Sequence, residues 1–118
     1  MDPIQETLKE TNTSAKESKS IVCAHCLFKI TSPEFLFFVD GLHVYHFTNP
    51  VGNSFQIRLF SKASGCKEEG SPSIEYTWFP NFAWNFALCA NCNRHLGWKY
   101  HSELKTFFGL IANQIIEI

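Results

Sequence analysis

Short apolar runs bounded by turn residues follow one another along the chain from residue 21 onward. Residues 54–60 alternate apolar and polar side chains, which is typical of a strand with one buried face. We expect further strands at residues 35–39, 43–47, 83–88, 97–100 and 106–111. Asp40-Gly41 and residues 49–53 have the composition of tight turns between strands. The pattern predicts an all-β domain with mostly antiparallel strands.

Two stretches depart from this pattern. Residues 1–20 are rich in Glu, Lys, Ser and Thr and contain no aromatic residue. Such a segment buries too little apolar surface to offset the entropy of ordering it, so we expect a disordered tail ahead of a domain at residues 21–118. Residues 61–73 are polar and contain Gly65, Gly70 and Pro72, which predicts a surface excursion.

Composition narrows the function classes. The chain has 118 residues, of which 45% are hydrophobic, and it includes twelve Phe, enough for one domain with a bulky core. The net charge is −1 without a basic stripe, which argues against nucleic acid and membranes as partners. No apolar run is long enough to span a bilayer, and the polar N-terminus has no signal-peptide pattern. We therefore expect an intracellular protein, cytoplasmic and/or nuclear.

Two Cys-x-x-Cys pairs, Cys23/Cys26 and Cys89/Cys92, carry the clearest chemistry in the sequence. Each pair alone is compatible with a redox motif, but together they supply the four thiolates of a structural Zn²⁺ site. Because the pairs lie far apart in the chain, one zinc ion would connect distant segments. Five cysteines without an export signal fit metal binding in a reducing compartment better than disulfides. The fifth, Cys66, is expected to be an inert thiol.

The three tryptophans, Trp78, Trp84 and Trp98, all lie in the C-terminal half. One interpretation is that they are core residues whose indole N–H groups bond to backbone carbonyls. The other is that they form an aromatic cage around a small ligand. The residues alone leave both interpretations open.

Three motifs, taken in order, resemble the thalidomide-binding (CULT) domain family typified by cereblon. They are Phe47-x-Asn49-Pro50-x-Gly52, Glu75-x-x-Trp78-Phe79-Pro80-x-x-Ala83-Trp84 and Cys89-x-x-Cys92-x-x-His95-Leu96-Gly97-Trp98-Lys99-Tyr100. The resemblance covers residues 23 to about 111. It implies a β-tent fold, in which two antiparallel sheets are pinned by Zn²⁺ at the four cysteines. It also implies that the protein is not an enzyme.

The resemblance further implies a cage for cyclic imides, such as glutarimide, thalidomide-type drugs or a cyclic imide at a protein C-terminus. In the implied cage, Trp78, Trp84 and Trp98 are the walls and Tyr100 is the floor. Tyr76 and Thr77 lie where main-chain groups contact the ligand, and Asn49, Pro50 and Phe55 lie at the mouth. Tyr76, Val51 and Phe55 stand where vertebrate members have histidines, as in the bacterial single-domain relatives. The Lon-like domain and adaptor-binding helices of the ubiquitin-ligase receptor are absent from this sequence, so a ligase adaptor is expected only if they exist elsewhere in the native protein.

Three other functions compete with imide binding. A reader of methylated lysine or another quaternary ammonium would use the same aromatic cage through cation–π contacts. A methionine sulfoxide reductase of related fold needs a nucleophilic cysteine on a late strand, and the sequence has no cysteine after Cys92. RNA-end binding by a related zinc fold needs a basic surface, which the composition does not provide.

Overall fold

The computed structural model describes residues 19–118. The disordered tail expected at residues 1–20 lies outside this range except for its last two residues. Of these, Ser20 exchanges two main-chain hydrogen bonds of 3.0 and 2.8 Å with Ile118. The first described residues are thereby paired with the C-terminal ones.

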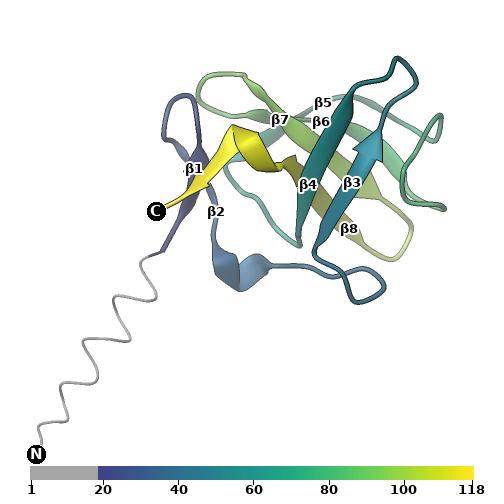
Figure 1. Ribbon diagram of the computed structural model, residues 1–118, viewed down its shortest axis with the longest axis horizontal. Coiled ribbons are helices and arrows are strands. Elements are labelled where there is room, and N and C mark those ends of the chain that lie inside the picture. Colours follow the sequence, from purple (N-terminus) through teal and green to yellow (C-terminus); the bar gives the residue numbers. More distant parts are fainter. Residues whose placement is uncertain (1–18) are drawn as a thin grey trace, which may run out of the picture.

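The described chain folds into nine strands and two short 3₁₀ helices, in two antiparallel sheets (Figure 1). The elements are β1 (Ile21–Cys23), β2 (Lys29–Thr31), η1 (Pro33–Phe35), β3 (Val44–Thr48), β4 (Ser54–Phe60), β5 (Cys66–Ser73), β6 (Ala83–Cys89), β7 (His95–His101), β8 (Thr106–Ile111), η2 (Ala112–Gln114) and β9 (Ile115–Glu117). The small sheet has the order β2-β1-β9, and the large sheet has the order β3-β4-β8-β7-β6-β5. The predicted all-β class with two antiparallel sheets is confirmed.

The expected strand at residues 35–39 is wrong. Pro33 begins η1 instead, and the segment makes only single bridges, at Leu36 and Val39. Phe37 and Val39 pack onto the aromatic core of the large sheet without joining a ladder, whereas Leu36 and Phe38 are exposed. The turn that follows is as predicted: Asp40 and Gly41 both have positive φ, and Val39 and Leu42 exchange two main-chain hydrogen bonds of 3.0 and 2.9 Å.

The surface excursion expected at residues 61–73 is only partly right. Residues 66–73 form β5, an edge strand paired with β6, and most of its residues are exposed. Because both faces of this edge strand meet solvent, its sequence lacks the apolar alternation that reveals a strand. Its Lys, Glu and Pro residues suit an exposed edge.

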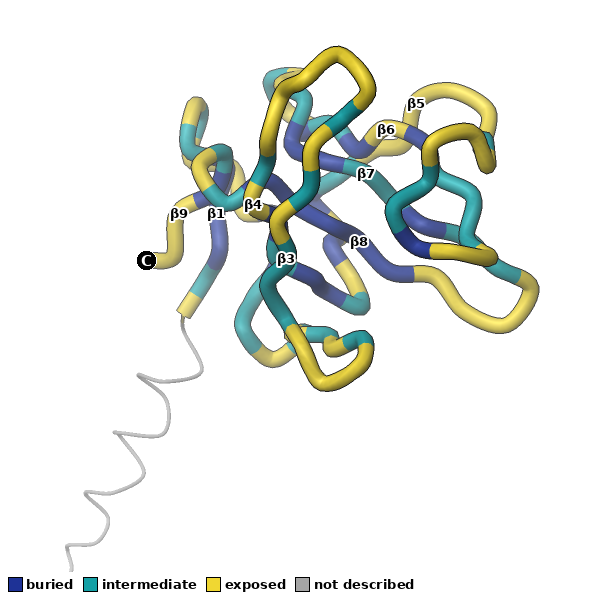
Figure 2. Tube along the Cα trace, turned by 45° about the vertical axis from the view of Figure 1, so that its right-hand side comes forward, coloured by how far each residue is buried: buried dark blue, intermediate teal, exposed yellow. Residues whose placement is uncertain are grey.

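The central strand β8 is buried over most of its length, as the dark tube in Figure 2 shows. Phe108 faces the core shared with the small sheet, where Ile21, Ile30 and Leu96 also pack. Phe107 faces the second core, with Tyr100 and the aromatic residues around it. The large sheet therefore separates two sites: cysteines lie with the first core and tryptophans with the second.

Within residues 19–118 the structure contains no helix with the length and apolar character that a membrane crossing requires.

Candidate metal centre and aromatic pocket

Both Cys-x-x-Cys pairs fold into the same tight turn. The residue after the second cysteine has a left-handed conformation in each, with φ of 66° at Leu27 and 69° at Asn93. The N–H of Leu27 donates to the carbonyl of Cys23 over 2.8 Å, and Asn93 donates to Cys89 over the same distance. Each turn therefore presents two sulfurs on one side of the backbone.

The four cysteine sulfurs form a compact cluster in which all lie within 4.8 Å of one another. The Cys23 and Cys92 sulfurs are 3.8 Å apart, and those of Cys26 and Cys89 are 3.6 Å apart. A tetrahedral zinc site with Zn–S bonds of about 2.3 Å has sulfur–sulfur edges of about 3.8 Å. Disulfides need about 2.05 Å, so these spacings fit metal ligands. The four predicted ligands are positioned to hold one metal ion.

The charge of the thiols also calls for a cation. Asn91 Nδ2 donates to the Cys26 sulfur over 3.4 Å, and this bond, together with the Phe28 main chain and the neighbouring thiols, lowers the pKa of Cys26 to about 6. The main-chain N–H of Arg94 lowers the pKa of Cys92, but burial and the other three thiols raise it to about 12. Four thiolates in one cluster repel one another, and a dication removes that penalty.

The metal centre joins the two sheets. Cys23 ends β1 in the small sheet, whereas Cys89 ends β6 in the large sheet. The second cysteine of each pair lies in the turn that follows. Metal binding would therefore fix the small sheet against the end of the large one.

Cys66 lies beside this centre at the start of β5, not in a polar loop as the sequence suggested. Burial, with a further contribution from Cys89 and Cys23, raises the pKa of Cys66 to about 12. A nucleophilic thiol needs the opposite shift. The reductase hypothesis therefore finds no suitable nucleophile here.

A second candidate site is an aromatic pocket of about 410 Å³ on the other face of the large sheet. Its lining comes from the β3–β4 loop, the loop before β6, and strands β4, β6 and β7: Asn49, Pro50, Phe55, Tyr76, Trp78, Trp84, Phe86, His95, Trp98 and Tyr100. Every residue expected around the cage lines this pocket except Thr77. Below we call this the Trp pocket.

The walls of the Trp pocket are braced by ring contacts. Trp78 and Trp98 have ring centroids 5.0 Å apart at an interplanar angle of 74°. Behind Trp78, Phe47 stacks at 4.7 Å, which fixes the tilt of this wall. Trp84 donates its indole N–H to the Glu75 carbonyl over 2.7 Å, and Tyr100 is 98% buried beneath, since only 2% of its surface is exposed. Trp84 thus makes the indole-to-carbonyl bond expected of a core residue and also lines the pocket, so it has features of both interpretations.

A side-chain hydrogen bond fixes the loop before β6, which contributes Tyr76 and Trp78 to the pocket lining. The Thr77 hydroxyl donates to the Phe82 carbonyl over 2.7 Å, so this side chain fixes the loop and does not line the cavity. Tyr76 has a φ of 57° and its side chain is 73% exposed at the mouth. Among the hydrogen bonds of the described residues, none uses the main-chain groups of Tyr76 or Trp78. These groups are free to bond a ligand.

Asn49 shapes the mouth of the pocket from the β3–β4 loop. Its side-chain oxygen accepts from the N–H groups of Val51 and Asn53 over 3.2 and 2.9 Å. This bonding closes the loop and holds Pro50 at the pocket edge. Val51 itself is largely exposed.

Phe86 and His95 line the Trp pocket although the sequence analysis did not assign them to it. Phe86 lies two residues after Trp84 on β6 and pairs across the sheet with Trp98, so strand alternation could have revealed it. His95 stood only within the third motif of the sequence. Its ring packs edge-on against Trp98 at 5.0 Å, and its Nε2 bonds to the Gly97 carbonyl over 2.8 Å. Burial lowers the pKa of His95, which favours the neutral ring.

The fold and these two sites define a class: an all-β domain in which four cysteines join two sheets and a tryptophan pocket opens on the larger one. No protein-family model matches the chain. Curated cereblon proteins of several animals, however, are similar to the chain. The chain is 32% identical to cereblon of Danio rerio in an alignment of 107 positions that covers 82% of the chain, and 35% identical to cereblon of Xenopus tropicalis in one of 103 positions that covers 81%. It is 28% identical to cereblon of Drosophila melanogaster in an alignment of 124 positions that covers 97% of the chain.

The chain belongs to the cereblon-type (CULT) domain family. It spans only 24%, 23% and 21% of the length of these three relatives. What it shares with them is therefore the domain described above.

Proposed function

We propose that this domain binds cyclic imides in the Trp pocket, with one structural Zn²⁺ held by Cys23, Cys26, Cys89 and Cys92. The observation that carries this proposal is the pairing of aromatic walls with free main-chain groups at Tyr76 and Trp78. A cyclic imide has an apolar CH₂ side and a polar edge of two carbonyls and one N–H. The pocket offers a matching surface for each.

The energetics favour such a ligand. Enclosing each ring CH₂ between indole faces contributes about 0.8 kcal/mol. The polar edge needs partners, because a buried unpaired N–H or C=O costs about 1–3 kcal/mol. In our proposal the imide N–H donates to the Tyr76 carbonyl, and an imide carbonyl accepts from the Trp78 N–H. Asn49, Pro50 and Phe55 border the part of the ligand that leaves the pocket.

The cellular ligand in this proposal is a protein whose C-terminal residue has cyclised to an imide. The domain itself performs no chemistry on that ligand, so we propose a binding module rather than an enzyme. In a longer protein, it would act as the substrate-binding part of a ubiquitin-ligase receptor only with a Lon-like, adaptor-binding part. The reduced thiols of the zinc site suit an intracellular location.

A methylated-lysine reader is less well supported by the same geometry. A trimethylammonium group would gain cation–π contacts with the indoles, but it has neither donor nor acceptor for Tyr76 and Trp78. None of the residues that line the Trp pocket is an aspartate or glutamate that would balance its charge.

The test is a titration of intrinsic tryptophan fluorescence with glutarimide in zinc-replete buffer. All three tryptophans line the pocket, so the signal reports this site alone. We expect saturable quenching, and we expect Trp98→Ala to weaken binding about thirty-fold or more, the effect of losing about 2 kcal/mol at a central aromatic contact. Leu104→Ala, at a 91% exposed position outside the pocket, is the matched control and keeps the wild-type affinity.

Trimethyl-lysine serves as the competitor in the same assay and should not displace glutarimide. Absence of quenching in a folded, zinc-loaded sample would refute the imide proposal. Quenching by trimethyl-lysine alone would establish the cation reader instead.

A further inference from the structure

The large sheet has a gap beside the Trp pocket. Strand β8 pairs with β4 only from Ile57 to Phe60, and with β7 only from Gly97 to His101. After Ile111 the chain turns into η2 and continues as β9 in the small sheet. Strand β8 lies between β4 and β7 but ends at Ile111. The first residues of β4 and of β7 therefore extend past its end.

The main chain of β4 presents an open edge to this gap. The N–H of Leu59 donates to His43 on the β3 side over 3.0 Å. Because main-chain groups alternate sides along a strand, those of Arg58, Gln56 and Ser54 point the other way. Arg58 lies opposite Leu110 of β8, and the last β4–β8 pair is Ile57 with Ile111. In an antiparallel ladder such a pair is bordered by a hydrogen bond from the Ala112 N–H to the Gln56 carbonyl, which leaves the Gln56 N–H and both main-chain groups of Ser54 facing the gap.

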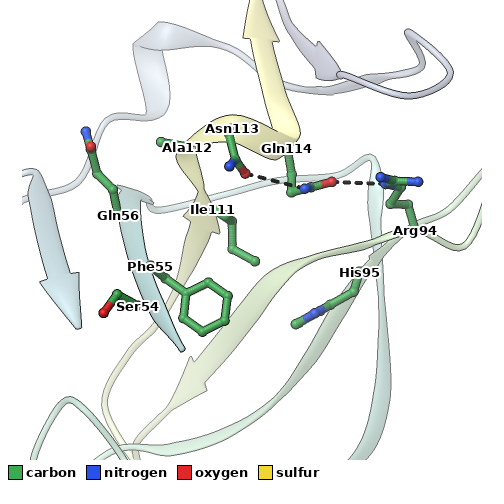
Figure 3. A pocket seen from close by; sticks show the side chains of 9 residues that line it. All are labelled: Ser54, Phe55, Gln56, Arg94, His95, Ile111, Ala112, Asn113 and Gln114. Carbon is green, nitrogen blue, oxygen red and sulfur yellow. Dashed lines mark hydrogen bonds between the residues drawn. The ribbon is translucent and has the colours of Figure 1, made fainter. Parts of the chain in front are cut away.

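The gap is a groove of about 670 Å³, shown in Figure 3. Its lining comes from the start of β4, the start of β7 and the β8–η2 junction: Ser54, Phe55, Gln56, Arg94, His95, Ile111, Ala112, Asn113 and Gln114. Phe55 and His95 also line the Trp pocket, and in Figure 3 they lie on opposite sides of the groove below Ile111. The groove therefore adjoins the Trp pocket, with these two side chains at the border.

The chemistry of the groove matches a polypeptide. Three lining side chains, Gln56, Asn113 and Gln114, carry amides that pair with peptide groups. Arg94 is the one charged side chain in the lining. Its Nε donates to Gln114 Oε1 over 3.0 Å, and this bond occupies one of the five guanidinium donors. An acidic side chain is the partner best suited to the others.

We propose that this groove receives, in extended form, the residues that precede a C-terminal cyclic imide, and that they pair with the main chain of Ser54 and Gln56 as a short added strand. The inference rests on the proposed function, because the imide in the Trp pocket fixes one end of the peptide. Strand addition at an open edge is a general mode of peptide recognition, in which main-chain bonds supply affinity and side-chain contacts supply specificity. Here Arg94 favours an acidic residue in the bound segment.

The first experiment compares two ligands on the zinc-loaded domain. One is 3-acetamidoglutarimide, and the other is a six-residue peptide that contains one Glu and ends in the same aminoglutarimide. We expect the peptide to bind about ten-fold more tightly, the effect of one or two net main-chain hydrogen bonds. Methylation of alternate peptide nitrogens should remove this gain at positions of one parity only, because a strand turns every second N–H toward its neighbour.

Two protein variants and one control locate the effect. Asn113→Trp fills the groove and should abolish the ten-fold gain in peptide affinity, while the small imide binds as before. The control Leu104→Trp adds the same side chain at an exposed position outside the groove and should retain the ten-fold gain. Arg94→Gln should remove the preference for Glu over Gln in the peptide.

Equal affinity of peptide and small imide for the wild-type domain, or a gain insensitive to methylation parity, overturns the groove proposal alone. No binding of the small imide overturns the proposed function and this inference with it.

Discussion

Single residues in left-handed backbone conformations shape both sites. Leu27 and Asn93 close the two cysteine turns, and Tyr76 turns the loop beside the Trp pocket, with φ of 66°, 69° and 57°. Such a conformation costs about 1–3 kcal/mol at a non-glycine residue and persists only where the surroundings enforce it. Metal binding can enforce the first two. The third is held by the Thr77 hydroxyl, which explains why Thr77 matters to the pocket without lining it.

At the residue scale, His43 should make stability depend on pH. Arg58 Nε donates to its Nε2 over 3.3 Å, so Nδ1 carries the proton that bonds the Phe37 carbonyl over 3.2 Å. This arrangement needs a neutral ring, and burial, aided by the nearby charge of Arg58, lowers the pKa of His43 from its ordinary value. The folded state therefore binds this proton less readily than the unfolded state. Its contribution to stability is full above pH 6.5 and is lost as the pH falls through the folded-state pKa.

The measurement is the difference in Tm between pH 7.5 and pH 5.5. Wild-type protein should lose more than His43→Gln, in which this histidine no longer titrates. His46→Gln, at an exposed position of strand β3, which begins directly after His43, is the control and should behave as wild type. Protonation of the zinc ligands affects all three proteins and cancels in the comparison. Equal losses in wild type and His43→Gln would contradict the prediction.

At the scale of elements, the strands that can be predicted are those whose sequence pattern reflects their burial: alternation for a half-buried strand and an apolar run for a fully buried one. Residues 54–60 alternate in sequence and form β4 with the expected bounds, and residues 106–111 form β8 as expected. The short strands β1, β2 and β9 were missed, because three residues are too few to show a period. Residues 35–39 have a strand's composition but pack onto the core of the large sheet without a ladder, and nothing local in the sequence distinguishes the two outcomes.

The sites were more predictable than these elements. Cysteine spacing identified the metal cluster, and motif resemblance identified the tryptophans, because both depend on residue types that seldom occur by chance at those spacings. Phe86 and His95 needed the β6–β7 register to be recognised as pocket residues. The groove beside them depends on where β8 leaves the sheet, which is a property of strand pairing and not of any single segment.

Strands β7 and β8 approach so closely that Gly97 tolerates no side chain. A Cβ there would lie 2.1 Å from the Gly109 carbonyl oxygen and 2.9 Å from the Leu110 Cα, both in the backbone of β8. Gly97→Ala must separate the strands next to Trp98, so we expect a loss of about 3 kcal/mol or more. We also expect weaker glutarimide binding in the protein that remains folded. Thermal melts should show a fall in Tm of about 12 °C or more.

Gly41→Ala is the matched control for this effect. Gly41 has a φ of 80° but open space around it, so an added Cβ meets conformational strain without a clash. That strain is worth about 1–2 kcal/mol and should leave glutarimide affinity unchanged. A Gly97→Ala protein as stable as Gly41→Ala would show that β7 and β8 can separate freely.

At the scale of the whole molecule, the cysteine cluster and the two hydrophobic cores hold the two sheets together. The small sheet has only three short strands, and its contact with the large sheet depends on the core around Ile21, Ile30 and Leu96 and on the cysteine cluster. The Trp pocket lies on the opposite face of the large sheet, within the second core. Strand β6 runs through both regions, since Trp84 lies near its start and Cys89 at its end. Loss of the metal would therefore release the end of a strand that also carries a pocket wall.

We accordingly expect zinc removal to abolish both the cooperative melt and glutarimide binding. Structural zinc contributes on the order of 10 kcal/mol to folding, which is comparable with the entire 5–15 kcal/mol stability of an ordinary domain. Cys26→Ala should lose bound zinc, measured by metal analysis, and with it the thermal transition. Cys66→Ala removes a thiol packed against the same cluster but outside the four ligands, so it should keep one zinc per chain and a cooperative melt. If the chelated domain melts cooperatively and still binds glutarimide, the two hydrophobic cores suffice, and the metal only fixes the small sheet.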